Sequence, residues 1–150
     1  MNTNKTKVII SMSPEETMKL GEDFAKALKQ GDVVAFYGEL GSGKTTMIKG
    51  ICSGLGIEGG VRSPSFVFLR IYKAENTVYH FDFYRLKKKE ELLNTGYDEF
   101  FYNSGIVLLE WADRIEDLLP ELRFDVVMKI LNENEREIRI SHTGQRVWSM

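Results

Sequence analysis

The chain has 150 residues, of which 43% are hydrophobic and 28% charged, a composition ordinary for a soluble globular protein. This length predicts a single domain that is large enough to bury a proper core. With a formal net charge of −2, the chain lacks the basic character that unaided, sequence-independent binding of nucleic acid requires. No apolar run approaches the roughly 20 residues that span a bilayer and no secretory segment is visible, so the expected location is the cytoplasm.

The N-terminal part predicts a strand followed by a helix. Residues 7–12 are rich in β-branched side chains and predict a strand at the edge of a sheet. Ser13 and Glu16 fit a capping box with Ser13 as N-cap, and the helix is expected to run to about Lys29, with Gly31 as its end. The core positions expected on this helix are Leu20, Phe24 and Leu28.

The next segment carries a specific phosphate-binding signal. Residues 38–45, Gly-Glu-Leu-Gly-Ser-Gly-Lys-Thr, fit the pattern G-x-x-x-x-G-K-[ST]. Residues 32–37 before them predict a strand, and residues 45–55 after them space their apolar side chains for a helix. Strand, glycine loop and helix are the context that distinguishes a phosphate loop from an ordinary glycine turn. Cys52, the single cysteine, falls in this helix and is expected to be a small buried apolar residue.

The residue types of this loop suit the binding of a nucleoside triphosphate with magnesium. Glycines let the backbone amides close round a phosphate, and the start of the following helix adds its positive end. Lys44 can reach the β- and γ-phosphates, and the Thr45 hydroxyl is placed to ligate Mg²⁺. The residues expected to bind the nucleotide are Glu39, Leu40, Gly41, Ser42, Gly43, Lys44, Thr45 and Thr46.

A β-hairpin is predicted downstream of the loop. Its arms are residues 66–73 and 78–84, joined by the polar turn 74–77. Alternation in the second arm separates an aromatic face from a less apolar one. Asp82 lies on the less apolar face with His80, near the end of the strand.

An acidic residue ends the following strand. Two short helical segments, 85–93 and 94–102, precede an apolar run at 105–111. Such a run predicts a buried parallel strand whose Glu110 would face the phosphate site. P-loop proteins hold magnesium with a residue of this kind, usually Asp, so Glu110 is the candidate here. The alternative is an acid that merely caps the segment after it.

The C-terminal part predicts a short helix, stopped by Pro120, and a second hairpin at 124–131 and 136–141. Arg136 and Arg139 are interpreted as solvated charges of an edge strand, with contact to a base or a phosphate as the alternative. Together the elements predict an α/β fold. We expect a single-domain P-loop NTPase with a central, mostly parallel sheet, antiparallel hairpin additions and flanking helices.

The loop alone does not choose among kinases, GTPases and ATPases. No Asn-Lys-x-Asp follows a late strand to select guanine, and the chain has little room for the lid and acceptor-binding domain of a small-molecule kinase. A compact ATPase is therefore the favoured interpretation. A small-molecule kinase and a nucleotide-gated binding module with negligible hydrolysis are the alternatives.

Four motifs, in their order and spacing, resemble the bacterial TsaE family, formerly called YjeE. They are the phosphate loop at 38–46, Ser-Pro-Ser at 63–65, His-Phe-Asp-Phe-Tyr-Arg at 80–85 and Glu-Trp at 110–111. The resemblance covers about residues 13–141, and the His-Phe-Asp-x-Tyr-Arg block followed by the acid and tryptophan is its most specific part. Ser65 departs from the family, which usually has threonine there, but it keeps the hydroxyl.

The resemblance implies an ATPase in the synthesis of N6-threonylcarbamoyladenosine at position 37 of transfer RNAs that read codons beginning with A. In that family the ATPase associates with the transferase TsaD and with TsaB, and its hydrolysis of ATP permits repeated turnover of the complex. Transfer RNA would be held mainly by the partners, which suits the acidic net charge of this chain.

Carried over to this sequence, the resemblance makes Lys44 and Asp82 the catalytic residues. Thr45 and Glu110 would hold Mg²⁺ directly or through water. Asp82 would be either a third magnesium partner or the residue that orients the attacking water, since both roles need a carboxylate near the γ-phosphate.

Two further sites follow from the same resemblance. Ser63, Pro64 and Ser65 would form a switch that senses the γ-phosphate. Trp111 would either contribute to the partner interface or pack in the core.

Overall fold

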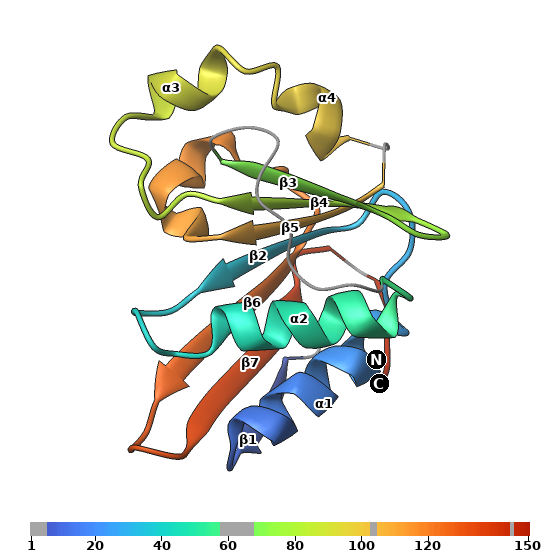
Figure 1. Cartoon of the computed structure of the whole chain (residues 1–150), viewed down its shortest axis with the longest axis vertical. Coiled ribbons are helices and arrows are strands. Elements are labelled where there is room, and N and C mark those ends of the chain that lie inside the picture. The colour runs from blue at the N-terminus through green and yellow to red at the C-terminus, as the bar shows by residue number, and fades with distance from the viewer. Residues whose placement is uncertain (1–5, 58–67, 103–104, 145) are drawn as a thin grey trace.

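The computed structural model describes residues 6–57, 68–102, 105–144 and 146–150 (Figure 1). Its strands are β1 (Lys7–Ser11), β2 (Val33–Tyr37), β3 (Leu69–Lys73), β4 (Thr77–Asp82), β5 (Ile106–Glu110), β6 (Phe124–Ile130) and β7 (Arg136–His142). Its helices are α1 (Pro14–Ala25), α2 (Lys44–Gly54), α3 (Lys89–Leu93), α4 (Asp98–Phe101) and the 3-10 helix η1 (Ala112–Leu118). Within these ranges, no helix has the length and apolar character needed to cross a membrane.

The described strands form one sheet of seven, in the order β1-β7-β6-β2-β5-β4-β3. The four central strands, β6, β2, β5 and β4, run parallel to one another. The strands β3, β7 and β1 join antiparallel at the two sides. One strand of each predicted hairpin therefore belongs to the parallel centre of the sheet, and the other strand pairs antiparallel beside it. The predicted α/β fold with a mostly parallel centre is confirmed.

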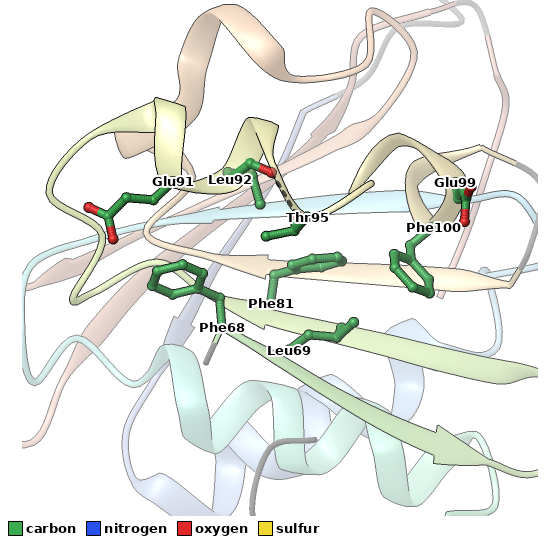
Figure 2. A pocket seen from close by; sticks show the side chains of 8 residues that line it. All are labelled: Phe68, Leu69, Phe81, Glu91, Leu92, Thr95, Glu99 and Phe100. Carbon is green, nitrogen blue, oxygen red and sulfur yellow. Dashed lines mark hydrogen bonds between the residues drawn. The ribbon is translucent and has the colours of Figure 1, made fainter. Parts of the chain in front are cut away.

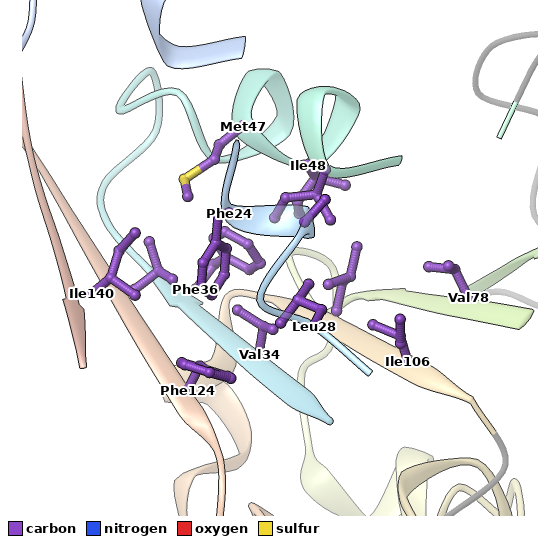
Figure 3. Packing of buried hydrophobic residues seen from close by; sticks show 14 of the residues in the cluster. Phe24, Leu28, Val34, Phe36, Met47, Ile48, Val78, Ile106, Phe124 and Ile140 are labelled. Carbon is purple, nitrogen blue, oxygen red and sulfur yellow. The ribbon is translucent and has the colours of Figure 1, made fainter. Parts of the chain in front are cut away.

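Helices cover both faces of the sheet, so the central strands are buried on both sides (Figure 1). Alternate residues of a strand point to opposite faces. Val34 and Leu108 belong to the cluster under α1 and α2, whereas Ala35 and Leu109 pack on the side of α3, α4 and η1. Figure 3 shows the first cluster, where Phe24 of α1 reaches down between α2 and the sheet. Burial on both faces explains why β5 is a continuous apolar run.

The helices α1 and α2 lie side by side with their backbones in close contact (Figure 1). A Cβ atom on Gly50 would lie 2.1 Å from the carbonyl oxygen of Met18, and one on Gly21 would lie 2.4 Å from the carbonyl oxygen of Met47. Both distances are far below van der Waals contact, so these two positions require glycine. The close approach seats the helix that begins at the glycine loop against α1.

The start of α1 agrees with the prediction better than its end does. The Ser13 hydroxyl accepts the N–H of Glu16 at 3.1 Å, as expected of an N-cap. The Glu16 carboxylate accepts the N–H of Met12 rather than that of Ser13. The helix ends at Ala25, not near Lys29, because the next backbone amides bond to carbonyls three residues back and tighten the chain into turns.

The strand β7 corrects a second expectation. It lies between β1 and β6, so it is an inner strand, and the edges of the described sheet are β1 and β3. The Arg139 guanidinium pairs with Glu137 of the same strand, with Nε 2.9 Å from Oε1. Arg136 reaches the glycine loop instead. The interpretation of both arginines as charges of an edge strand is therefore wrong.

Candidate nucleotide-binding site

A pocket of about 360 Å³ lies where β2, β4 and β5 end and α2 begins. This is the carboxyl-terminal edge of the parallel strands, where open α/β sheets bind their ligands. The predicted nucleotide-binding residues, Glu39 excepted, surround this one hollow together with Asp82 and Glu110. The residues lining the pocket are Leu40, Gly41, Ser42, Gly43, Lys44, Thr45, Thr46, Asp82, Tyr84, Glu110 and Trp111.

The glycine loop leaves β2 and ends at the first turn of α2. Gly43, the residue before the helix, has φ 101°, a left-handed conformation that favours glycine. No side chain caps the helix, so the amides of its first turn remain available to an anion. The Ser42 hydroxyl is buried and has no hydrogen-bond partner in the described part of the chain. A loop built in this way suits a phosphate group.

Lys44 is a buried cation whose direct contacts are neutral groups. The residue is 5% exposed, its ammonium donates to the backbone carbonyls of Gly38 and Glu39, and its Nζ lies 3.9 Å from the centre of the Trp111 ring. Burial lowers the pKa of Lys44 below its usual value, although the nearby Glu110 carboxylate opposes the shift. A charge that has left water without a directly bonded counter-ion strongly attracts an anion.

Thr45, Glu110 and His80 form a hydrogen-bonded series at the side of the pocket. The Thr45 hydroxyl donates to Oε1 of Glu110 at 2.9 Å, and Nε2 of His80 lies 2.7 Å from Oε2. Glu110 is 3% exposed. Burial alone would raise the pKa of Glu110, but the hydrogen bonds from His80 and Thr45 and the charge of Lys44 outweigh burial and bring the pKa below its usual value. Glu110 is therefore a carboxylate at neutral pH.

Asp82 and Trp111 complete the wall of the pocket. Asp82, the last residue of β4, is paired in register with Glu110 of β5, and its Oδ1 accepts the N–H of Tyr84 at 3.1 Å. Trp111 follows Glu110 and has φ 59°, the one positive φ among the described non-glycine residues. This left-handed turn sends the chain from β5 into η1 and leaves the indole beside Lys44, in the pocket rather than deep in the core.

The described residues include no group of three or more His, Cys, Asp or Glu side chains that could enclose a metal ion. Magnesium that is bound with a nucleotide does not need such a cage, because phosphate oxygens and water supply most of its ligands. The hydroxyl of Thr45 and the carboxylates of Glu110 and Asp82 are hard oxygen donors, and all three residues line the same pocket. The residues present therefore fit Mg²⁺ carried by a nucleotide.

The predicted switch, Ser63, Pro64 and Ser65, lies outside the described residues. Two other side chains contribute to the site. The sequence predicts no role for His80, and contact with a base or a phosphate is only the alternative interpretation of Arg136. His80 lies behind Glu110, and its position on the same strand face as Asp82 is the local signal that points to it. Arg136 donates from Nη2 to the carbonyl oxygen of Gly41 at 3.2 Å, a contact across 95 positions that no local pattern indicates.

A second hollow of about 360 Å³ lies between the sheet and α3 and α4 (Figure 2). Its walls are mainly aromatic and aliphatic, and carboxylates stand at two sides of it in Figure 2. No residue of the glycine loop lines it, whereas residues 40–46 line the first pocket. Its lining residues are Phe68, Leu69, Phe81, Glu91, Leu92, Thr95, Glu99 and Phe100.

The fold and the first pocket define the class of the protein. A strand, a glycine loop and a helix at the carboxyl edge of a parallel sheet form the fold of the P-loop NTPases. The crystal structure of YdiB from Bacillus subtilis has a similar fold, with a TM-score of 0.81 and 36% sequence identity, over 94% of this chain and 88% of that one.

The chain belongs to the TsaE family. The family model described as "Threonylcarbamoyl adenosine biosynthesis protein TsaE" matches residues 11–138. The tRNA threonylcarbamoyladenosine biosynthesis protein TsaE of Bacillus subtilis is 41% identical over 137 residues, which are 91% of this chain and 85% of the relative. The protein of the same name from Treponema pallidum is 35% identical over 132 residues, which are 88% of this chain and 98% of the relative. The family resemblance expected from four motifs is confirmed.

Proposed function

We propose that this chain is a single-domain P-loop ATPase required for N6-threonylcarbamoyladenosine formation at position 37 of transfer RNAs reading codons that begin with A. The names of its curated relatives support the pathway. One observation supports the proposed ATPase activity. Lys44 is a buried cation that faces a pocket with neutral groups as its direct partners, beside a hydroxyl and two carboxylates suited to Mg²⁺.

The phosphates of ATP would enter the pocket at the glycine loop. The Lys44 ammonium would exchange its bonds to backbone carbonyls for bonds to the β- and γ-phosphate oxygens, where its charge is compensated. The amides of the first turn of α2 would donate to the same groups. In this arrangement Asp82, which lines the same pocket, would be available to the γ-phosphate end of the nucleotide.

Magnesium would be held by Thr45 and Glu110, directly or through water, and Asp82 would be a third partner or would orient the attacking water. Bound Mg²⁺ would neutralise charge that develops on the β- and γ-phosphate oxygens. Asp82 and Glu110 lie opposite each other on neighbouring strands, so one carboxylate can serve the metal while the other faces the attacking water.

The nucleoside end of ATP would lie on the far side of the glycine loop. A hollow of about 170 Å³ there borders Gly41, Gly43 and Thr46, which also line the phosphate pocket. It is closed by the start of α1 at Ser13 and by Arg136. The hydrogen bond from Arg136 to Gly41 ties this hollow to the phosphate loop.

The proposed partners are TsaD and TsaB, with transfer RNA engaged indirectly through their complex. We expect slow hydrolysis by the isolated chain, because P-loop enzymes often need a group supplied in trans to complete the site. Rapid turnover by the pure monomer would count against this dependence.

The test is threonylcarbamoyladenosine formation on transfer RNA over many turnovers, with purified TsaD, TsaB and a supply of threonylcarbamoyl-adenylate. The intact chain should sustain turnover, whereas Lys44→Ala should reduce ATP hydrolysis by at least about a hundredfold and stop turnover after the first cycle. Lys19→Ala is the matched control, because Lys19 is an exposed lysine of α1 that pairs with Asp23.

Two outcomes of this experiment would redirect the proposal. If Lys44→Ala sustains turnover while ATP and ADP change the affinity for TsaD, the chain is a nucleotide-gated binding module. If neither the intact chain nor Lys44→Ala affects the modification, the proposed nucleotide site is kept and the proposed pathway is rejected. A screen of metabolites for a phosphorylated product would then test the small-molecule kinase.

A further inference from the structure

A buried histidine stands behind the acidic residue of the phosphate pocket. His80 is 1% exposed and lies on β4, paired in register with Leu108 of β5. Glu110 is two residues further along β5, on the same face of the sheet. The two side chains meet with Nε2 of His80 2.7 Å from Oε2 of Glu110.

The Glu110 carboxylate has one partner for each of its oxygens. Oε2 faces the imidazole, and Oε1 accepts the Thr45 hydroxyl at 2.9 Å, at the start of α2. Carboxylate oxygens accept hydrogen bonds, so the tautomer that makes this contact a hydrogen bond carries its proton on Nε2 and donates it to Oε2. The rotation of the carboxylate is therefore fixed between an inner partner on β4 and an outer partner on α2.

The rest of the imidazole makes no directed bond in the described part of the chain. Nδ1 is buried without a hydrogen-bond partner, and the ring stacks on Tyr72 with centroids 6.5 Å apart. His80 and Tyr72 also line a hollow of about 530 Å³ together with residues of α2. The chemical contribution of His80 is thus a single buried donor aimed at Glu110.

We propose that His80 is a positioning residue that holds Oε2 of Glu110 inward, so that Oε1 and the Thr45 hydroxyl face the phosphate pocket together. The inference rests on the proposed function, in which Thr45 and Glu110 hold Mg²⁺. Groups that orient the ligands of a metal typically change its affinity 10–100-fold when they are removed.

Three substitutions of His80 distinguish the effect of its N–H donor from the effect of its ring. His80→Gln keeps an N–H near the place of Nε2, His80→Asn ends where Nδ1 stands, and His80→Leu removes all polar atoms. The measurement is the affinity for ATP by calorimetry, first in EDTA and then at increasing magnesium concentrations. The magnesium midpoint is the magnesium concentration at which half of the increase in ATP affinity is reached. We expect ATP affinity in EDTA to stay within about threefold in all variants. The magnesium midpoint should rise about 10–100-fold for Leu and Asn and return to within a few-fold for Gln.

Tyr72→Phe is the control, because it removes a hydroxyl beside the ring without touching the bond to Glu110. Its magnesium midpoint should match that of the unaltered chain. Urea unfolding of every variant shows whether it is folded. If the role of His80 were purely structural, its substitution would lower the stability of the fold and the fraction of protein that binds ATP, but it would not move the magnesium midpoint.

The results distinguish this proposal from the function on which it rests. If ATP binding by the unaltered chain depends on magnesium but the magnesium midpoint is unchanged in His80→Leu and His80→Asn, the positioning role alone is overturned. Equal impairment of His80→Gln and His80→Leu also overturns it, since the donor would not be what matters. If ATP binding by the unaltered chain does not depend on magnesium, both the positioning role and the proposed metal site are overturned.

Discussion

Asp82 is the residue whose two possible roles can be separated by one substitution. It ends β4 opposite Glu110 and lines the phosphate pocket. We predict that Asp82→Asn lowers ATP hydrolysis by about 10²–10⁴-fold, the range typical of a lost acid or base, and leaves ATP binding within a few-fold. A raised magnesium midpoint identifies a metal partner, and an unchanged midpoint identifies a residue that orients water.

The control for this substitution is Asp113→Asn. Asp113 acts on the charge of Lys44 from η1 but does not line the pocket. Its hydrolysis rate should stay within a few-fold of the unaltered chain. Hydrolysis at the normal rate by Asp82→Asn would remove that residue from the mechanism.

Cys52 gives a prediction that depends on pH. The structure leaves Cys52 partly buried, not fully buried as the sequence predicts. This burial raises the pKa of its thiol to about 11, and no charged group opposes the shift. The thiolate is the reactive form, so its fraction near pH 8 should be about a hundredfold below that of a thiol with the ordinary value. We expect iodoacetamide to label the native chain about a hundredfold more slowly than the unfolded chain, with the native rate rising about tenfold per pH unit between 7 and 9. A native rate equal to the unfolded rate would show that burial does not protect this thiol.

At the scale of elements, the contact between α1 and α2 depends on glycines inside helices. Helix propensity favours alanine over glycine by about 1 kcal/mol, so packing must be the reason for their presence. An added Cβ on Gly50 would meet the Met18 carbonyl at 2.1 Å. We predict that Gly50→Ala lowers the free energy of unfolding by about 1–3 kcal/mol, measured in urea, because the backbones must separate.

The control for Gly50→Ala is Lys49→Ala, the exposed neighbour on the same helix. It should change the unfolding free energy by no more than about 0.5 kcal/mol. A Gly50→Ala chain as stable as this control would show that the helices separate without cost. Because α2 begins at the phosphate loop, we also expect Gly50→Ala to weaken ATP binding, although Gly50 does not line the pocket.

At the scale of the whole molecule, the pocket joins segments that are far apart in the chain. The loop after β2, the start of α2 and the ends of β4 and β5 meet there only in the folded state. ATP with Mg²⁺ should therefore stabilise the native state by about 2.7 kcal/mol at a hundredfold excess over Kd. Thermal unfolding measures this as a rise in Tm. Removal of magnesium with EDTA should reduce the rise, and Lys44→Ala should abolish it.

Much of this architecture follows from local patterns. The glycine loop, α2, β5 and both hairpins are predicted because turn chemistry and side-chain periodicity act over a few residues. The same patterns fail at the end of α1, where Leu28 is buried as expected but is carried by turns rather than by the helix. They also fail for β7, since an alternating strand looks the same at an edge and inside a sheet.

The sequence by itself determined the phosphate loop, its flanking strand and helix, and the family, because these signals are carried by neighbouring residues and short motifs. Only the tertiary structure decided that His80 lies behind Glu110, 30 positions away, and that Arg136 holds Gly41, 95 positions away. These contacts depend on which strands are neighbours and in which register. Long-range pairing of that kind is a property of the assembled sheet and is not encoded in the periodicity of any single segment.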